Sequence, residues 1–215
     1  MTTSLIRPLV LTAALAGTAT GARAGPAAWQ ADTSKSRIRV QVFKKGLLSG
    51  MAHDHLFVPQ EWRATASFDP TEPSDVHVEV VIAADSLRDD QPKLSPEDRE
   101  KVNRQAAGRD VLDASRYREI RFTASELELG APAPGQPAGK FQGVLAGTLS
   151  LHGRERRLSV RLVATAEGGG WRVVGKVSFK QSDFGIEPYS GFLGTIAVKD
   201  EVNVDFDLLM TTPSS

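Results

Sequence analysis

The stretch that decides the fold reads LAGTLSLHGRERRLSVRLVA and covers residues 145–164. Its apolar or small side chains fall at every second position, first from Leu145 to Leu151 and then from Leu158 to Ala164. A period of two is typical of a β-strand with one buried face. The segment between the two runs, His152-Gly153-Arg154, has the composition of a tight hairpin turn. The stretch therefore predicts an antiparallel β-hairpin.

Six further runs along the chain have the same period. They cover residues 38–42, 62–68, 76–82, 120–129, 171–179 and 202–208. The alternation in 120–129 slips before Leu127, which predicts a β-bulge. Eight strands joined mostly by short turns predict an all-β fold, an eight-stranded antiparallel barrel, because closure leaves no free sheet edge.

One helix interrupts the strand pattern and begins after Ser95. Ser95 can cap it, Pro96 suits its first position, and Asp98 completes the spacing of a capping box. Gly108 is expected to end the helix. Because Val102 is almost its only apolar side chain, we expect the helix to lie over the surface or across an opening of the barrel.

Residues 1–24 have the order of a secretory signal, which predicts a mature barrel domain over residues 25–215. Arg7 precedes a short apolar run, Leu9 to Ala16, and Ala22-Arg23-Ala24 resembles a cleavage site. A buried N-terminal helix is the alternative.

The charges of the chain balance. Lys plus Arg and Asp plus Glu both number 26, so the net charge is zero, which argues against a nucleic-acid partner. The absence of cysteine excludes thiolate metal sites, c-type haem attachment and cysteine nucleophiles.

Several positions predicted to face inward carry small side chains, and these favour an internal cavity. They are Ala64, Ala66, Ala124, Gly147, Ala164 and Gly175. A barrel of eight strands can keep room for one small ligand. The alternative is that larger neighbours close over these positions, since protein interiors are densely packed.

The His53-Asp54-His55 segment is the most conspicuous polar constellation. In an extended chain both imidazoles point to the same face. Two imidazoles on one face can supply part of the ligand set of a zinc, copper or haem site. The alternative is a hydrogen-bonded cluster at the barrel mouth.

No nucleophile elbow and no phosphate-binding glycine loop occurs in the sequence. The acidic segment 85–90 is interpreted as a solvated loop, and His77 as a solvated strand residue.

Two loops are rich in apolar side chains and are expected either to rim a pocket or to plug the barrel end. Leu47 and Phe57 flank the histidines, and Phe184 and Phe192 belong to the segment before the last strand. The segment 184–193 is expected to close the pocket.

Four stretches, in this order, resemble the YceI-like, polyisoprenoid-binding family of exported lipocalin-like barrels. They are Phe68-Asp69, VLDASRYREIRF (111–122), GTLSLHG (147–153) and FKQSDFGI (179–186). The resemblance spans roughly Trp29 to Met210. It implies an eight-stranded lipocalin-like barrel with one or two short helices, whose pore holds a long isoprenoid tail. It also implies a periplasmic binding or carrier role, no catalytic residues, and a membrane cytochrome b as a partner, which makes a quinone a reasonable ligand.

The leading hypothesis is therefore a periplasmic carrier, not an enzyme, that binds an apolar polyprenyl lipid or quinone. We expect five inward aromatic residues to line the pocket, namely Phe43, Trp62, Phe122, Trp171 and Phe206. Five further residues are expected to line it as well: Leu47, Phe57, Leu145, Phe184 and Phe192. The second hypothesis is a metal- or haem-binding redox protein that uses His53 and His55. A third is an interaction module for a membrane partner without a small ligand.

Overall fold

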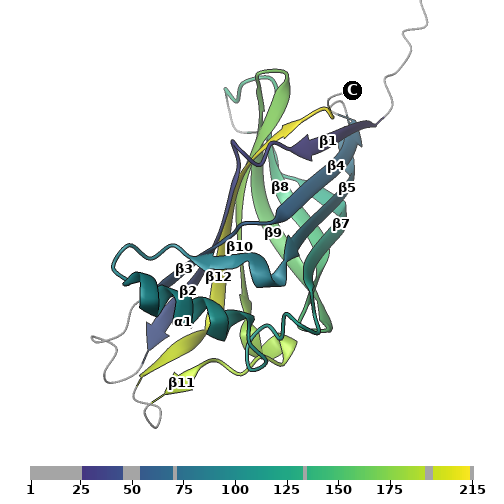
Figure 1. Ribbon diagram of the computed structural model, residues 1–215. Coiled ribbons are helices and arrows are strands. Elements are labelled where there is room, and N and C mark those ends of the chain that lie inside the picture. Colours follow the sequence, from purple (N-terminus) through teal and green to yellow (C-terminus); the bar gives the residue numbers. More distant parts are fainter. Residues whose placement is uncertain (1–25, 46–53, 70–71, 133–134, 192–195, 214–215) are drawn as a thin grey trace, which may run out of the picture.

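The computed structural model describes residues 26–45, 54–69, 72–132, 135–191 and 196–213 (Figure 1). Its strands are β1 (Ala27–Ala31), β2 (Arg37–Lys45), β3 (His55–Pro59), β4 (Trp62–Asp69), β5 (Glu72–Ala83), β6 (Leu87–Asp89), β7 (Glu119–Leu129), β8 (Lys140–Leu151), β9 (Arg154–Glu167), β10 (Gly170–Lys180), β11 (Ser190–Gly191) and β12 (Ile196–Thr211). The helical elements are α1 (Pro96–Ala107) and the short 3₁₀ turns η2 (Ala84–Ser86) and η3 (Gln181–Phe184). None of the described helices is long and apolar enough to cross a membrane.

The strands close into an eight-stranded antiparallel barrel, which confirms the predicted fold class. Hydrogen-bonded neighbours follow the order β1-β4-β5-β7-β8-β9-β10-β12, and β12 pairs with β1 to close the ring. Toward its other end β12 pairs with β2, which continues to β3 and β6. Three barrel strands are therefore each built from two segments, β1 with β2, β3 with β4, and β5 with β6, broken by short irregular stretches.

Each predicted alternating run lies within one of these strands. Ala124 pairs with Gly147, whereas the next paired residue of β7 is Glu126, so the predicted bulge falls between them. The turn between β8 and β9 holds His152 and Gly153 at positive φ angles of 51° and 70°, as a tight hairpin of this handedness requires. The short segments β1, β3, β6 and β11 were not predicted.

The helix α1 begins and ends as predicted. Ser95 Oγ accepts a hydrogen bond from the backbone N–H of Asp98 at 3.1 Å, Pro96 occupies the first turn, and Gly108 follows the last helical residue. The helix lies across the end of the barrel opposite to β1 (Figure 1). Val102 and Ala106 pack against buried apolar residues there, so this face of α1 covers the barrel end.

Buried apolar side chains gather in two clusters, one at each end of the barrel. The first includes Trp29, Phe68 and Trp171 near β1. The second includes Phe57 and Phe184, below α1. Between them several inward side chains, such as Val40, Val80 and Val173, are only half-buried, which indicates unfilled space.

Candidate functional site

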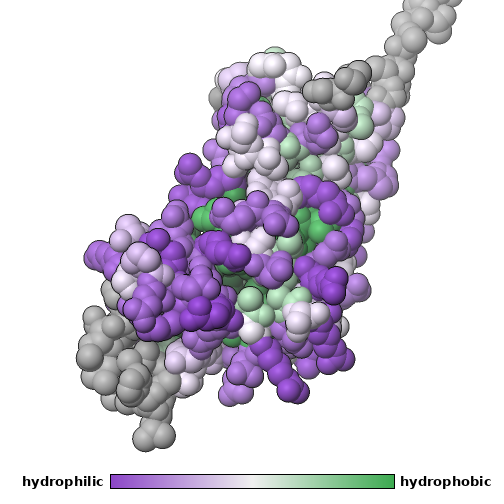
Figure 2. All heavy atoms as spheres, in the orientation of Figure 1, coloured by the Kyte–Doolittle hydropathy of each residue, from purple (hydrophilic) through white to green (hydrophobic). Residues whose placement is uncertain are grey.

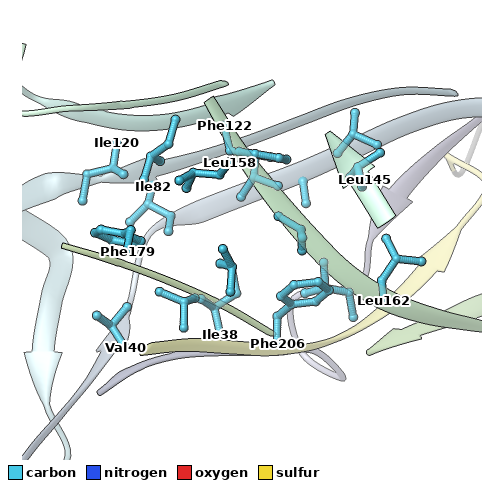
Figure 3. Close-up of a pocket in the computed structure, with 18 of the residues that line it drawn as sticks. Ile38, Val40, Ile82, Ile120, Phe122, Leu145, Leu158, Leu162, Phe179 and Phe206 are labelled. Carbon is cyan, nitrogen blue, oxygen red and sulfur yellow. The ribbon is translucent and has the colours of Figure 1, made fainter. Parts of the chain in front are cut away.

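A cavity of about 290 Å³ extends through the barrel between the two clusters. It reaches Phe68, Phe141 and Met210 at the β1 end, and Ala106 and Leu112 at the α1 end. Figure 3 shows Ile82, Ile120 and Phe122 facing Ile38, Val40 and Phe206 across this space. Its volume is close to the lower limit of about 300 Å³ that is usual for small-molecule sites.

The wall of this cavity is almost entirely hydrocarbon. Among the described residues that line it, Thr65 and Gln181 are the polar ones, and none is charged. The half-buried inward residues of β2, β5 and β10, such as Val40, Val80 and Val173, present their exposed surface to this space. An apolar wall offers no hydrogen-bond partners to water, so the space suits an apolar guest.

Charged side chains lie on the outer face of the barrel and pair with one another there. Arg172 donates to Glu167 at 2.9 Å and to Asp207 at 3.1 Å. The hydrogen bond from Arg172 lowers the pKa of the Glu167 carboxyl below its ordinary value. In Figure 2 the surface is mostly hydrophilic, and apolar side chains show through a hollow beside α1.

Four of the residues that we expected in the pocket lie on its wall, namely Phe57, Phe122, Leu145 and Phe206. Their contact with a ligand stays a prediction. Most aliphatic residues of the wall were not predicted as pocket residues, although the same alternation places them on the inner face.

Three expected pocket residues belong to the packing around the cavity instead of its wall. Trp171 lies in an aromatic floor, with ring centroids 5.8 Å from Phe68 and 5.1 Å from Phe141. Trp62 packs against the same cluster. Phe184 is completely buried at the α1 end, where its ring meets Phe179 edge-on at 5.4 Å. Trp62, Trp171 and Phe184 therefore lie behind the wall, whereas their neighbours Phe68, Phe141 and Phe179 line the cavity.

The expectation that Phe43 faces inward is wrong. Val42 lines the cavity, and its neighbour Phe43 takes the opposite face of the strand because successive side chains alternate. The ammonium of Lys199 lies 5.5 Å from the centroid of the Phe43 ring. Leu47, His53 and Phe192 lie outside the described residues.

The small residues that were predicted to face inward do not all border the cavity. Ala64, Ala66 and Ala164 line the cavity, as expected. At Gly147 and Gly175 the space is taken by aromatic rings of the paired strands, those of Phe122 and Phe206. Ala124 is buried in the core cluster. Part of the cavity therefore arises from small residues, and part of the volume they leave is filled by neighbours.

A polar pair lies on the inner face at the α1 end. Nδ1 of His55 forms a short hydrogen bond with the carboxylate of Asp89, whose side chain is fully buried. The backbone N–H of Gln91 donates to the other carboxylate oxygen at 2.7 Å, and Asn103 on α1 accepts the backbone N–H of Asp89 at 2.8 Å. The interpretation of 85–90 as a solvated loop is wrong for Asp89, because its backbone and side chain pack below α1. His77 is exposed, as expected.

The metal hypothesis gains no support from the described part of the chain. It contains no group of three or more His, Cys, Asp or Glu residues that could hold a metal ion. The nitrogen of His55 that faces Asp89 is already occupied by that hydrogen bond.

A family model described as "YceI-like domain" matches residues 29–210. The chain belongs to the YceI-like family. This agrees with the resemblance noted from the sequence, and with a closed barrel around an apolar cavity.

Solved structures share this YceI-like fold. The Burkholderia cenocepacia protein BcnA is 24% identical, with a TM-score of 0.64, and the match covers 85% of this chain and 99% of that one. A polyisoprenoid binding domain from Saccharophagus degradans, implicated in plant cell wall breakdown, is 14% identical, with a TM-score of 0.58, and the match covers 86% and 98%. At these identities the likeness concerns the fold. No curated protein sequence matches the chain.

Proposed function

We propose that this YceI-like protein binds an apolar isoprenoid-type lipid or quinone inside its barrel and acts as a carrier, not as a catalyst. The observation that carries the proposal is the continuous cavity whose wall, among the described residues, contains no charged side chain. The description of the Saccharophagus degradans neighbour as a polyisoprenoid binding domain supports the same ligand class.

The energetics of such a site favour a long hydrocarbon tail. Each methylene removed from water contributes about 0.8 kcal/mol, so a prenyl chain gains affinity without a specific polar contact. A cavity bounded by strands is largely pre-formed, so little ordering of the protein opposes binding.

We further propose that the protein works in the periplasm, after removal of residues 1–24. The signal-like order of this segment supports export. Fractionation of the native host followed by mass spectrometry of the intact protein tests this. We expect a chain that starts near Gly25 in the periplasmic fraction; a full-length cytoplasmic chain would contradict the proposal.

Organic extraction of the purified protein followed by lipid mass spectrometry tests the ligand class. We expect prenyl lipids or quinones in the extract, or uptake of added prenyl lipid by the delipidated protein. If several preparations contain no lipid and take up none, the carrier function is wrong.

A matched pair of neighbouring valines locates the binding. Val173 lines the cavity, whereas Val174 lies on the outer face of β10 and is 38% exposed. We expect Val173→Trp to fill the cavity and to abolish most lipid uptake, and Val174→Trp to leave uptake unchanged. Equal uptake by both variants would place the lipid outside the barrel.

A further inference from the structure

A polar pair lies beside the α1 end of the cavity, on an inner face that is largely apolar. Val42 pairs with His55 across β2 and β3, and Phe57 pairs with Asp89 across β3 and β6. Residues directly opposite in an antiparallel ladder point to the same side of the sheet. Since Val42 and Phe57 line the cavity, His55 and Asp89 lie on the same side of the sheet, next to these wall residues but not among the residues that line the cavity.

The surrounding contacts hold this pair in a fixed orientation. Both oxygens of the Asp89 carboxylate are occupied, one by His55 and one by the backbone N–H of Gln91. Asn103 holds the Asp89 backbone from α1, and Arg99, one turn earlier, donates to the Gln91 carbonyl at 2.8 Å. The His55 ring also lies 6.0 Å from the ring of Phe57, which is part of the cavity wall.

This orientation determines which nitrogen of His55 faces a ligand. The tautomer that satisfies this contact carries its proton on Nδ1 of His55, which then donates to the Asp89 carboxylate. Nε2 lies on the far side of the ring from this bond and remains for another partner. The His55 side chain is 20% exposed, whereas that of Asp89 is completely buried.

We propose that His55 is the head-group site of the barrel, and that its Nε2 binds the hydroxyl of a long-chain isoprenoid alcohol whose tail fills the cavity. Asp89 and Asn103 are positioning residues. The inference rests on the proposed lipid-binding function and adds the chemistry of the head group to it.

A hydroxyl fits this site better than an anion. It both donates and accepts, so it can pair with Nε2 whether or not that nitrogen carries a proton. The Asp89 carboxylate lies on the other side of the same ring, and its negative charge disfavours a second anion in this low-dielectric setting. The cavity wall itself supplies no cation among the described residues.

The test compares three probes on the full mature protein by fluorescence titration. They are geranylgeraniol, geranylgeranyl phosphate and the corresponding hydrocarbon without an oxygen. The variant is His55→Leu, and the matched control is His77→Leu, which removes an exposed imidazole from the outer side of β5. We expect His55→Leu to weaken binding of geranylgeraniol by about 3- to 10-fold, the usual range for one hydrogen bond. Binding of the hydrocarbon should not change, and His77→Leu should match the wild type.

The outcomes separate the two proposals. If His55→Leu binds all three probes as the wild type does, the head-group site is wrong while the carrier function stands. If geranylgeranyl phosphate binds more tightly than the alcohol and loses more affinity in His55→Leu, the assignment to a hydroxyl is wrong. If the wild type binds none of the probes, both the carrier function and the head-group site fail.

NMR of the imidazole nitrogens gives a readout that does not depend on folding of a variant. Addition of geranylgeraniol should shift the Nε2 resonance of His55 and leave that of Nδ1 in place, because Nδ1 stays bonded to Asp89. An unchanged Nε2 resonance at saturating geranylgeraniol would overturn the head-group site.

Discussion

The ring of Phe206 lies over Gly175, its direct partner in the ladder between β10 and β12. A β-carbon at position 175 would come within 2.5 Å of Phe206 Cζ and 2.6 Å of the carbonyl oxygen of Arg161. The absence of a side chain at Gly175 therefore leaves room for the Phe206 ring, which lines the cavity. The small size of Gly175 on β10 thus determines how Phe206 on β12 borders the cavity.

Gly175→Ala should therefore destabilise the protein by about 1–3 kcal/mol, because the Arg161 carbonyl is backbone and cannot move aside. Gly130→Ala is the control, since the nearest atom to its new β-carbon would be Cγ of the exposed Gln142 side chain at 3.3 Å. Urea unfolding measures both. Equal stability of the two variants would show that neither the Arg161 carbonyl nor the Phe206 ring constrains position 175.

The aromatic floor should be a major source of stability. Phe68 stacks on Trp29 with centroids 5.5 Å apart and contacts Trp171 and Phe141 edge-on. Phe68→Ala should lower the free energy of unfolding by about 3–5 kcal/mol, the usual range for a buried phenylalanine. Leu129→Ala, at a side chain that is 41% exposed, should change it by less than about 0.5 kcal/mol. A loss at Phe68 no larger than that at Leu129 would contradict this account of the floor.

The cap of α1 should control how firmly the helix covers the cavity end. Ser95→Ala removes the acceptor for the Asp98 backbone N–H and should destabilise the helix by about 0.5–2 kcal/mol. Hydrogen exchange in Pro96–Ala107 and dissociation of bound lipid should both become faster. Ser95→Asn keeps a capping oxygen and should behave as the wild type does. Faster exchange without faster lipid release would mean that α1 does not limit ligand exit.

Asp200 should make part of the stability depend on pH. The Ser182 hydroxyl and then the Ser182 backbone N–H bond its carboxylate at 2.6 and 2.9 Å, and these bonds lower the pKa of Asp200. A depressed pKa in the folded state stabilises the protein above the unfolded pKa, about 4, and this contribution is lost as pH falls through the folded pKa. Asp200→Asn should thus be less stable than the wild type at neutral pH, and the difference should shrink in acid. A difference that does not vary with pH would contradict this assignment.

Much of the architecture follows from local sequence patterns. The runs from Leu145 to Leu151 and from Leu158 to Ala164 form strands because period-two burial is a property of each segment alone. The bulge after Ala124 and the cap at Ser95 were also predictable, since both depend on residues a few positions apart. The same alternation places Phe122 and Phe206 on the cavity wall.

The cavity and its polar rim were decided by the tertiary structure. Trp171 packs into the floor and not on the wall because Phe68 and Phe141, from two other strands, meet it there. Asp89 contacts His55 across 34 positions of sequence, and this contact exists only because β6 pairs with β3 below α1. Local alternation tells which face of a strand is apolar, whereas the register of non-adjacent strands determines which side chains meet and where space remains between them.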